Sequence, residues 1–312
     1  MLKNMLMRDV LVEFLREEMA KNENVVVLDA DLSKCSTTIC LNDVYPERML
    51  NVGIAEANMA GVAAGLSTYG FIPYITTFGP FATRRIADQL MISICYSKQN
   101  VKIVGADPGI CAELNGGTHM PLEDIGMLRS IPDIVIYEPT DVIEFNQALP
   151  QIQSHYGPVY IRMHRKSPPI VHKDDLKFDL FKAMVLEKGD DVTIVASGIM
   201  VKTALDAREE LAKEGISAEV ICCPTIKPLD SKTILKSVKK TGAVVTAENH
   251  NVMGALTSAV SEVLVENYPA PLRSVGVKEK FGEVGKEAYL RKVFNMEVKD
   301  VVKAAKDVIK AK

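Results

Sequence analysis

The residue best placed for chemistry in this sequence is Glu56, a single carboxylate that follows a Gly-Ile step and opens a run of small residues. The surrounding residues 51–65 read Asn-Val-Gly-Ile-Ala-Glu-Ala-Asn-Met-Ala-Gly-Val-Ala-Ala-Gly. Asn51 and Gly53 favour a turn, which places Glu56 in the first turn of a helix, where the helix dipole stabilises a negative charge. Because the following residues have little bulk, another backbone can approach closely. We therefore expect Glu56 at a buried contact suited to a catalytic acid; the alternative is an ordinary helix-terminal charge.

Three ring-bearing side chains are further candidates: Phe78, Phe81 and His119. Two aromatic residues three positions apart, beside a buried carboxylate, can hold a flat heteroaromatic ring by stacking, although packing in the core is the simpler alternative. His119 ends a long glycine-containing loop, residues 105–119. Such a loop is typical of a shaped functional surface.

Polar residues also follow several predicted strands, where α/β sheets present their sites. Asp29 and Asp31 can serve as metal ligands or as turn and capping residues. Arg165, within a His-Arg-Lys sequence, can bind an anion or belong to a solvated linker. His250 can contact a ligand or have a structural or interface role.

Composition limits the possible classes of protein. The chain has 312 residues, 47% hydrophobic and 25% charged, with a net charge of −3, which is typical of a soluble globular protein of two domains. The nearly balanced charge gives no indication of nucleic-acid or membrane binding, and we find neither a membrane-spanning apolar run nor a signal-peptide pattern. Six scattered cysteines form no CxxC pair and no Cys/His cluster, so neither a zinc site nor a disulfide framework is predicted. A reducing, cytoplasmic location is expected.

The elements that position these residues alternate between apolar strands and amphipathic helices. This alternation predicts an α/β fold with two domains, each a mainly parallel sheet flanked by helices. We expect a first domain over 1–166, a linker over 167–188 and a second domain over 189–312. The predicted helices are 5–20, one beginning near 56, 86–97, a short one ending near 129, 141–152, 200–214, 231–239, 254–267 and 297–310. The predicted strands are 25–28, 71–77, 101–104, 134–137, 158–163, 191–195, 218–222 and 243–246.

Motifs that bind a nucleotide or a metal–diphosphate are missing from the sequence: it contains no P-loop, no Rossmann GxGxxG and no Gly-Asp-Gly with a distant Asn. Four segments nevertheless resemble the transketolase family in order and spacing. They are residues 51–65, residues 77–81 with Asp88 and Gln89, residues 117–119 with 123–125, and residues 157–162. The resemblance covers nearly the whole chain. It implies a pyrimidine-binding domain followed by the family's C-terminal domain.

The resemblance also implies a role for each candidate residue. Glu56 would hydrogen-bond the aminopyrimidine ring of thiamine diphosphate and relay a proton that activates the cofactor. Phe78 and Phe81 would surround that ring. His119 would contact the oxygen of the donor sugar, and Arg165 would bind the substrate phosphate.

Four positions depart from the family pattern. Asn115 stands where transketolases usually carry an aspartate that contacts a donor hydroxyl, and it is the substrate-binding candidate at that position. Asp107 replaces a histidine that helps to bind phosphate, and its charge would repel that group. Cys35 replaces a serine that contacts the phosphate, and Arg84 replaces a third aromatic residue, where it would restore a positive charge. Cofactor activation is therefore predicted to be intact, whereas the sugar region is altered.

The resemblance predicts the C-terminal subunit of a split transketolase, transferring a two-carbon ketol unit between sugars or sugar phosphates. A separate N-terminal subunit would anchor the diphosphate through Mg²⁺. We expect a heterotetramer of two of each chain, with a self-dimer possible when this chain is alone. Two alternatives remain: a 1-deoxyxylulose-5-phosphate synthase-like or other thiamine-dependent decarboxylation, and a non-catalytic regulatory homologue.

Overall fold

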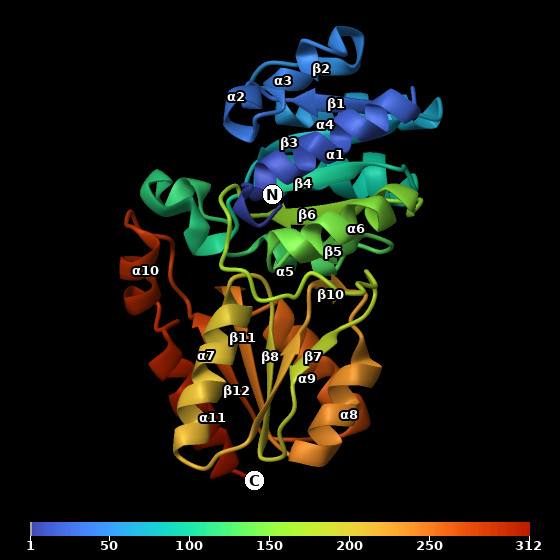
Figure 1. Ribbon diagram of the computed structural model, residues 1–312. Coiled ribbons are helices and arrows are strands. Elements are labelled where there is room, and N and C mark those ends of the chain that lie inside the picture. The colour runs from blue at the N-terminus through green and yellow to red at the C-terminus, as the bar shows by residue number, and fades with distance from the viewer. Residues whose placement is uncertain (1) are drawn as a thin grey trace.

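Two sheets of mainly parallel strands organise residues 2–312, the part of the chain that this computed structural model describes. The sheet built largely from the N-terminal half lies above the other in Figure 1, and helices pack against both sheets. The predicted α/β class, with two mainly parallel sheets flanked by helices, is therefore confirmed.

The first sheet has seven strands in the order β10-β5-β6-β4-β3-β1-β2, and only the β10–β5 pair is antiparallel. Its inner strands consist mostly of apolar residues and are buried, as is usual where helices cover both faces. The carboxyl ends of these parallel strands share one edge of the sheet. The strands are β1 (Val25–Asp29), β2 (Met49–Asn51), β3 (Ile72–Phe78), β4 (Lys102–Ala106), β5 (Val135–Tyr137), β6 (Val159–Met163) and β10 (Thr225–Lys227).

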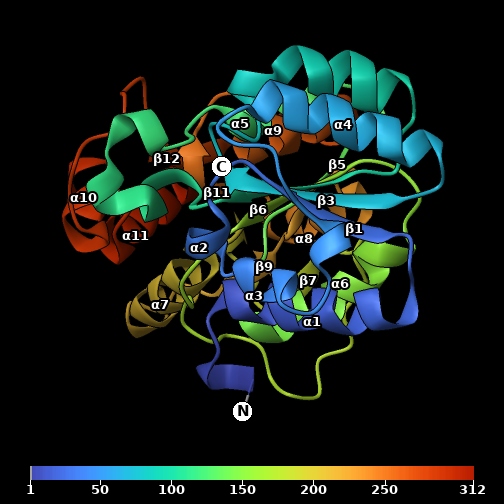
Figure 2. The same ribbon diagram turned by 90° about the horizontal axis from the view of Figure 1, so that it is seen from above.

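Helices pack on the two faces of the first sheet as separate layers (Figure 2). Helices α1 (Met7–Lys21) and α6 (Val142–Ser154) share one apolar cluster with the sheet, and α4 (Glu56–Thr68), α5 (Asp124–Arg129) and the π-helical segment η4 (Gln89–Tyr96) share another. Shorter helical segments connect these elements: Leu2–Asn4, α2 (Ser33–Ser36), α3 (Ile39–Asn42), Pro46–Arg48, Arg84–Ile86, Gly109–Asn115 and Gly117–His119.

The second sheet has five strands in the order β12-β11-β8-β9-β7, and only β7 is antiparallel to its neighbour. Helices α7 and α11 pack on one apolar cluster of this sheet and α8 and α9 on another. The strands are β7 (Met184–Glu187), β8 (Val192–Ala196), β9 (Ala218–Cys222), β11 (Val244–Asn251) and β12 (Leu272–Val277). The helices are α7 (Met200–Lys213), α8 (Ser231–Thr241), α9 (Leu256–Asn267), α10 (Glu287–Val293) and α11 (Val298–Ile309).

The two halves of the chain are joined by more than a connecting segment. Strand β10 comes from the second half of the chain but pairs with β5 of the first sheet. In return, Ile110, Met120 and Leu122 of the first half pack into the apolar cluster of the second sheet. The loop that carries His119 is therefore held by both sheets.

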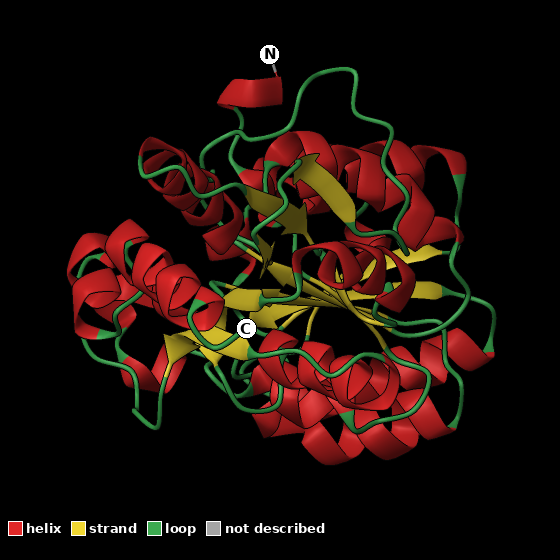
Figure 3. Cartoon of the chain, turned by 90° about the horizontal axis from the view of Figure 1, so that it is seen from below, coloured by secondary structure: helices red, strands yellow, loops and turns green. Residues whose placement is uncertain are grey.

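Most of the predicted elements are present, within a few residues of the expected bounds. Figure 3 shows the helices arranged around the strands. The predicted helix 86–97 is instead a 3₁₀ turn at Arg84–Ile86 followed by the π-helical η4. Strands β2, β10 and β12 and helix α10 were not predicted, and β7 forms from the last residues of the predicted linker. The domain boundaries at 166 and 189 stay a prediction. Within residues 2–312, no helix combines the length and apolar character needed to cross a bilayer.

Candidate active site

Glu56 is the first residue of α4, and its side chain is only 4% exposed. The preceding turn is held by Asn51, whose Oδ1 accepts hydrogen bonds from the amides of Gly53 (2.9 Å) and Asp31 (3.1 Å). Gly53 has a φ of +74°, a conformation in which glycine is unstrained. The turn that the sequence predicted from Asn51 and Gly53 is thus present, and it delivers a buried carboxylate to the start of α4.

Phe78, Phe81 and His119 form one aromatic cluster beyond the end of β3. The ring centroids of Phe78 and Phe81 lie 6.1 Å apart, and those of His119 lie 5.5 Å from Phe78 and 5.1 Å from Phe81. All three pairs meet edge to face, which is an energetically favourable arrangement for aromatic rings. The structure therefore brings together three residues that are 41 positions apart at most in the sequence (119 minus 78).

Arg85 connects Glu56 to this aromatic cluster. Its Nη1 donates a hydrogen bond to Glu56 Oε1 at 2.6 Å, and its guanidinium carbon lies 3.7 Å from the centre of the Phe81 ring. Sequence reasoning assigned Arg85 no role. The available signal was its spacing from Phe81, because residues four apart in a helical turn lie on the same side.

Arg165 lies at the other side of the cluster, half-buried after the end of β6. Its guanidinium pairs with the carboxylate of Asp107, hydrogen-bonds the sulfur of Cys35 and lies 5.1 Å from the centre of the Phe78 ring. Burial lowers the pKa of Arg165, but the hydrogen bond and charge of Asp107 outweigh burial and raise it overall. Two departures from the family pattern, Asp107 and Cys35, are thus direct partners of the predicted anion-binding arginine.

The loop before His119 carries the remaining candidates. Asn115 is exposed, and Thr118 Oγ1 lies 2.9 Å from His119 Nδ1, so that the other ring nitrogen of His119 faces away from this contact. Arg84 donates to Glu123 Oε1 at 2.6 Å and to the carbonyl of Thr118 at 2.8 Å. Because both contacts bind Arg84 to the loop, we assign it a positioning role here instead of the free positive charge suggested by the sequence.

The other polar residues at strand ends have structural partners. Asp29 accepts hydrogen bonds from the amide of Leu32 at 2.5 Å and from Thr76 Oγ1 at 3.2 Å, so it organises the turn after β1. His250 is fully buried, with its Nδ1 2.6 Å from the carbonyl of Asn251 and its Nε2 accepting from the amide of Gly126. Of the alternatives left open for these two residues, the structure favours the turn for Asp29 and an interface between the two halves for His250.

A buried ion network lies beside the loop that carries His119. Arg162, fully buried in β6, pairs with Asp124 (2.7 Å) and Glu138 (2.5 Å) and donates to the carbonyls of Pro121 and Asn249. Burying an arginine is tolerated when its donors are satisfied in this way. Pro121 and Asp124 follow the loop within a few residues, so the network fixes the segment just after His119.

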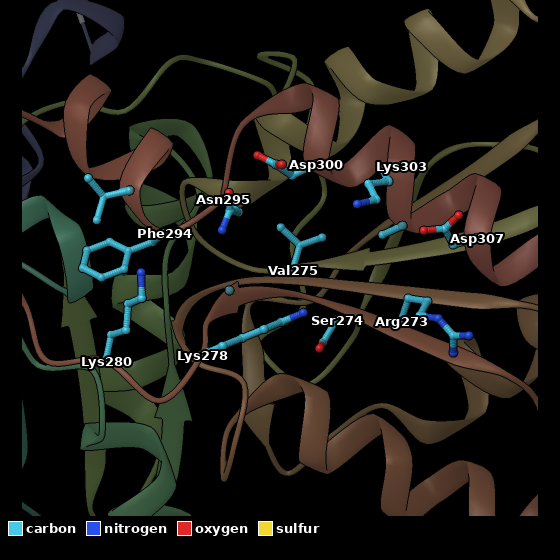
Figure 4. Close-up of a pocket in the computed structure, with 13 residues that line it drawn as sticks. Arg273, Ser274, Val275, Lys278, Lys280, Phe294, Asn295, Asp300, Lys303 and Asp307 are labelled. Atoms are coloured by element: carbon cyan, nitrogen blue, oxygen red, sulfur yellow. The ribbon is translucent and has the colours of Figure 1, made fainter.

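A separate surface hollow of about 420 Å³ lies between β12 and helices α10 and α11 (Figure 4). Its charged lining is Arg273, Lys278, Lys280, Lys303, Asp300 and Asp307. None of the described residues that line it was predicted to act in catalysis. The predicted chemistry therefore belongs to the first sheet.

Two family models match this chain. One, described as transketolase, pyrimidine binding domain, matches residues 3–170, and the other, described as transketolase, C-terminal domain, matches residues 181–301. The chain belongs to the transketolase family. The family predicted from the sequence is confirmed, and with it the class of enzyme: a transferase of the transketolase type, acting through thiamine diphosphate.

Individual relatives support the same assignment. The chain is 50% identical over 306 residues to the 6-deoxy-6-sulfo-D-fructose transketolase subunit SqwH of Clostridium sp. (strain MSTE9), covering 98% of this chain and 95% of that protein. It is 32% identical to transketolase-like protein 2 of Mus musculus, over 92% of this chain but only 46% of the mouse protein. Among solved structures, a split gene transketolase described as an inactive beta4 tetramer aligns with a TM-score of 0.89 and 41% identity, covering 98% of this chain and 99% of that one.

The geometry of the first sheet fits the pyrimidine end of thiamine diphosphate. A protonated heteroaromatic ring requires two contacts, a charged acceptor and a stacking surface. The buried carboxylate of Glu56 can be the acceptor, and the ring of Phe81 can be the stacking surface. In this structure the flat cation of Arg85 contacts both. The individual roles of Glu56, Phe78, Phe81, His119, Asn115 and Arg165 stay predictions.

Proposed function

We propose that this chain supplies the pyrimidine-binding half of the active site of a two-chain transketolase, and that the assembled enzyme transfers a two-carbon ketol unit between sugars. The observation that carries the proposal is the buried carboxylate of Glu56 at the start of α4, joined through Arg85 to the Phe81 ring in a chain of this family. The Phe78, Phe81 and His119 rings extend this contact toward Arg165.

Each residue of this chain has a defined task in the proposal. Glu56 holds and returns a proton at the pyrimidine ring, because a buried carboxylate at hydrogen-bond distance is an effective acid and base. Phe78 and Phe81 enclose the ring and exclude water. His119, held through Nδ1 by Thr118, offers Nε2 to the oxygen of the donor sugar. Bound thiamine diphosphate supplies the electron sink for cleavage of the carbon–carbon bond.

The partner chain, in this proposal, carries the Gly-Asp-Gly segment that binds the diphosphate and Mg²⁺. A contact surface is available on α4, where Ala57, Gly61 and Gly65 are exposed and a side chain added at either glycine would meet nothing within 4 Å. On the adjacent segment η4, Met91 is 51% exposed and Ile92 is 49% exposed. Exposed apolar and small residues in one patch are typical of an interface. We propose an assembly of two copies of each chain.

The proposed substrates are sugars that carry a singly charged anion, and a sulfonate in particular. Arg165 and Lys166 are paired with Asp107 and Glu113, so the positive charge at this end of the site is balanced. A phosphate carries a charge of about −1.5 to −2 at neutral pH, whereas a sulfonate carries one negative charge. A balanced site therefore discriminates against phosphate. The 50% identical relative, named for 6-deoxy-6-sulfo-D-fructose, agrees with this choice.

The alternative reactions are less well supported. The high identity with a transketolase subunit over nearly all of both chains disfavours a 1-deoxyxylulose-5-phosphate synthase-like reaction. A non-catalytic homologue would have no requirement for a buried carboxylate at the start of α4. We therefore keep ketol transfer as the proposed reaction.

The decisive test is turnover by this chain co-expressed with a polypeptide that carries the Gly-Asp-Gly segment. We expect ketol transfer from 6-deoxy-6-sulfo-D-fructose to an aldose in the presence of thiamine diphosphate and Mg²⁺. Glu56→Gln keeps the size of the side chain but removes the proton relay, so kcat should fall by roughly 10² to 10⁴. Glu17→Gln, a change at an exposed glutamate of α1, is the matched control. Near-normal kcat in Glu56→Gln would refute the assignment.

A further inference from the structure

Arg85 makes two contacts that match those assigned to the cofactor ring. It donates a hydrogen bond to Glu56 Oε1 at 2.6 Å, and its guanidinium carbon lies 3.7 Å from the centre of the Phe81 ring. Within residues 2–312, no side chain other than Arg85 donates a hydrogen bond to the Glu56 carboxylate. The two groups proposed to hold the pyrimidine are therefore both in contact with one arginine.

The guanidinium is chemically similar to a protonated aminopyrimidine. Each is flat and positively charged, each presents N–H donors in its plane to a carboxylate, and each stacks on an aromatic face. A guanidinium stacked at van der Waals distance leaves no room for a second flat group on the same face. The donor that already binds a carboxylate oxygen likewise occupies the position with the best hydrogen-bond geometry, so a second donor cannot take that position at the same time.

We propose that Arg85 occupies the pyrimidine site of this chain before the cofactor binds, and that the incoming ring displaces it. The inference rests on the proposed function, because it requires Glu56 and Phe81 to receive the ring. The Arg85 side chain is 44% exposed, so it can swing toward solvent without disturbing the core.

Arg85 has a second effect in the cofactor-free chain. Glu56 is nearly fully buried, and an ionised carboxylate in such a place is costly without a partner. The arginine supplies that partner until the ring replaces it. Only a fraction of the molecules then has Arg85 out of the site, and the apparent dissociation constant of the cofactor equals the intrinsic constant divided by that fraction.

The experiment is a calorimetric titration of the assembled two-chain complex with thiamine diphosphate in the presence of Mg²⁺. We expect Arg85→Ala to bind the cofactor about tenfold more tightly than the parent, as it would if the open site is about a tenth of the population. Arg85→Lys keeps the charge but loses the flat fork, so its affinity should lie between the two. Arg208→Ala, which removes a partly exposed pair with Glu187 in the second half of the chain, should leave the affinity unchanged.

A second measurement isolates the ring site. The fragment 4-amino-5-hydroxymethyl-2-methylpyrimidine lacks the diphosphate, and its binding to this chain alone, followed by nuclear magnetic resonance, should also strengthen in Arg85→Ala. Unchanged or weaker cofactor binding by Arg85→Ala, with the parent complex binding normally, would overturn the role of Arg85 and leave the proposed function intact. If the parent complex binds no thiamine diphosphate at all, the proposed function fails and this inference fails with it.

Discussion

Asp107 and Arg165 set the charge at the proposed sugar end of the site. The Asp107 side chain is almost fully buried, and its carboxylate pairs with the Arg165 guanidinium. Asp107 also has a φ of +59°, in the left-handed region where aspartate and asparagine are tolerated better than most residues. Asparagine is therefore a substitution that removes the charge and keeps both the shape and the backbone conformation.

Asp107→Asn should shift the preference of the enzyme from sulfonated toward phosphorylated sugars. Loss of the negative charge leaves Arg165 free to attract a dianion and removes a repulsion worth about 1 to 2 kcal/mol in a partly solvated site. The ratio of kcat/KM for the phosphorylated substrate over the sulfonated one should rise about tenfold. Steady-state kinetics with both substrates provides an internal control, since a general loss of activity leaves the ratio unchanged. An unchanged ratio would dismiss charge balance as the basis of selectivity.

The sequence predicted Glu56 and the three rings near it because each carries a chemical signal: a lone carboxylate among small residues, or aromatic residues at short spacing. Arg85 gave a weaker signal, because an exposed arginine beside Arg84 is usually solvated. Its role depends on a contact with Glu56, 29 positions earlier in the chain, which periodicity does not reveal. The same holds for the Asp107–Arg165 pair, which forms only when β4 and β6 lie side by side.

Helix α4 combines a buried and an exposed face of small residues. Met59, Ala60, Ala63 and Ala64 pack against the first sheet, whereas Gly61 and Gly65 remain exposed. Two exposed glycines in the middle of a helix lower its stability by about 1 kcal/mol each relative to alanine. Because these exposed glycines have no side chains, the backbone of a partner chain can approach this face of α4 closely.

Gly61→Leu should strengthen folding and weaken assembly. Leucine is a far better helix former than glycine, so the free energy of unfolding of this chain should rise by about 0.5 to 1 kcal/mol. The same side chain projects from the proposed interface, where we expect the affinity for the partner chain to fall at least about tenfold. Analytical ultracentrifugation of the mixed chains measures the affinity, and urea titration measures the stability.

The control for this prediction is Ala212→Leu, a similar enlargement at an exposed position of α7. It should leave the affinity between the chains unchanged. If Gly61→Leu and Ala212→Leu assemble equally well with the partner, the exposed face of α4 is not the contact.

Elements with a clear apolar period were predicted from the sequence, and those without one were missed. Strands β2 and β10 have three residues each, too few for a period, and β10 is formed only by pairing with a sheet from the other half of the chain. Strand β12 lies at the edge of its sheet, and only its last three residues are fully buried. Segment η4 has the composition of an α-helix, but in the structure it packs against α4 as a π-helix. Helix propensity does not distinguish a π-helix from an α-helix.

At the scale of the whole molecule, the two halves meet through buried polar contacts. Asn249, at the end of β11, accepts from the amide of Ile110 at 2.9 Å and donates to the carbonyl of Pro108 at 2.9 Å. Gly109 lies between these contacts with a φ of +50°, and a side chain there would collide with Asn249. The loop that carries His119 is therefore anchored in the second sheet, and the candidate site depends on the docking of both halves.

Several titrating groups lie near this junction. Burial raises the pKa of Glu144 to about 7 and that of Glu248 to about 7, in each case against the opposing effect of their partners. Burial lowers the pKa of His250 to about 4, although the charge of Asp124 opposes this shift. The raised pKa values of the glutamates make stability fall as the pH rises, whereas the lowered pKa of His250 makes stability fall as the pH drops. The two pH dependences therefore partly cancel in the parent protein.

His250→Gln should separate these effects. The folded pKa of His250 lies below its ordinary value of 6.5, so the folded state binds fewer protons than the unfolded one between pH 6.5 and about 4. The contribution of His250 is therefore fully present above pH 6.5 and is lost as the pH falls, by about 3 kcal/mol for this fully buried side chain. Glutamine does not titrate, and all other groups are shared by the two proteins.

The difference in unfolding free energy between the parent and His250→Gln should accordingly be largest near pH 7.5 and shrink steadily toward pH 4.5. Urea titrations at several pH values measure this difference directly. His155→Gln, at a half-buried histidine, is the comparison: burial and the charge of Lys102 lower the pKa of His155 as well, so its difference should also shrink toward pH 4.5, but by less than at the fully buried His250. If the His250→Gln difference is constant across this range, His250 binds protons equally in the folded and unfolded states, and the junction between the two halves is not sensitive to acid through this residue.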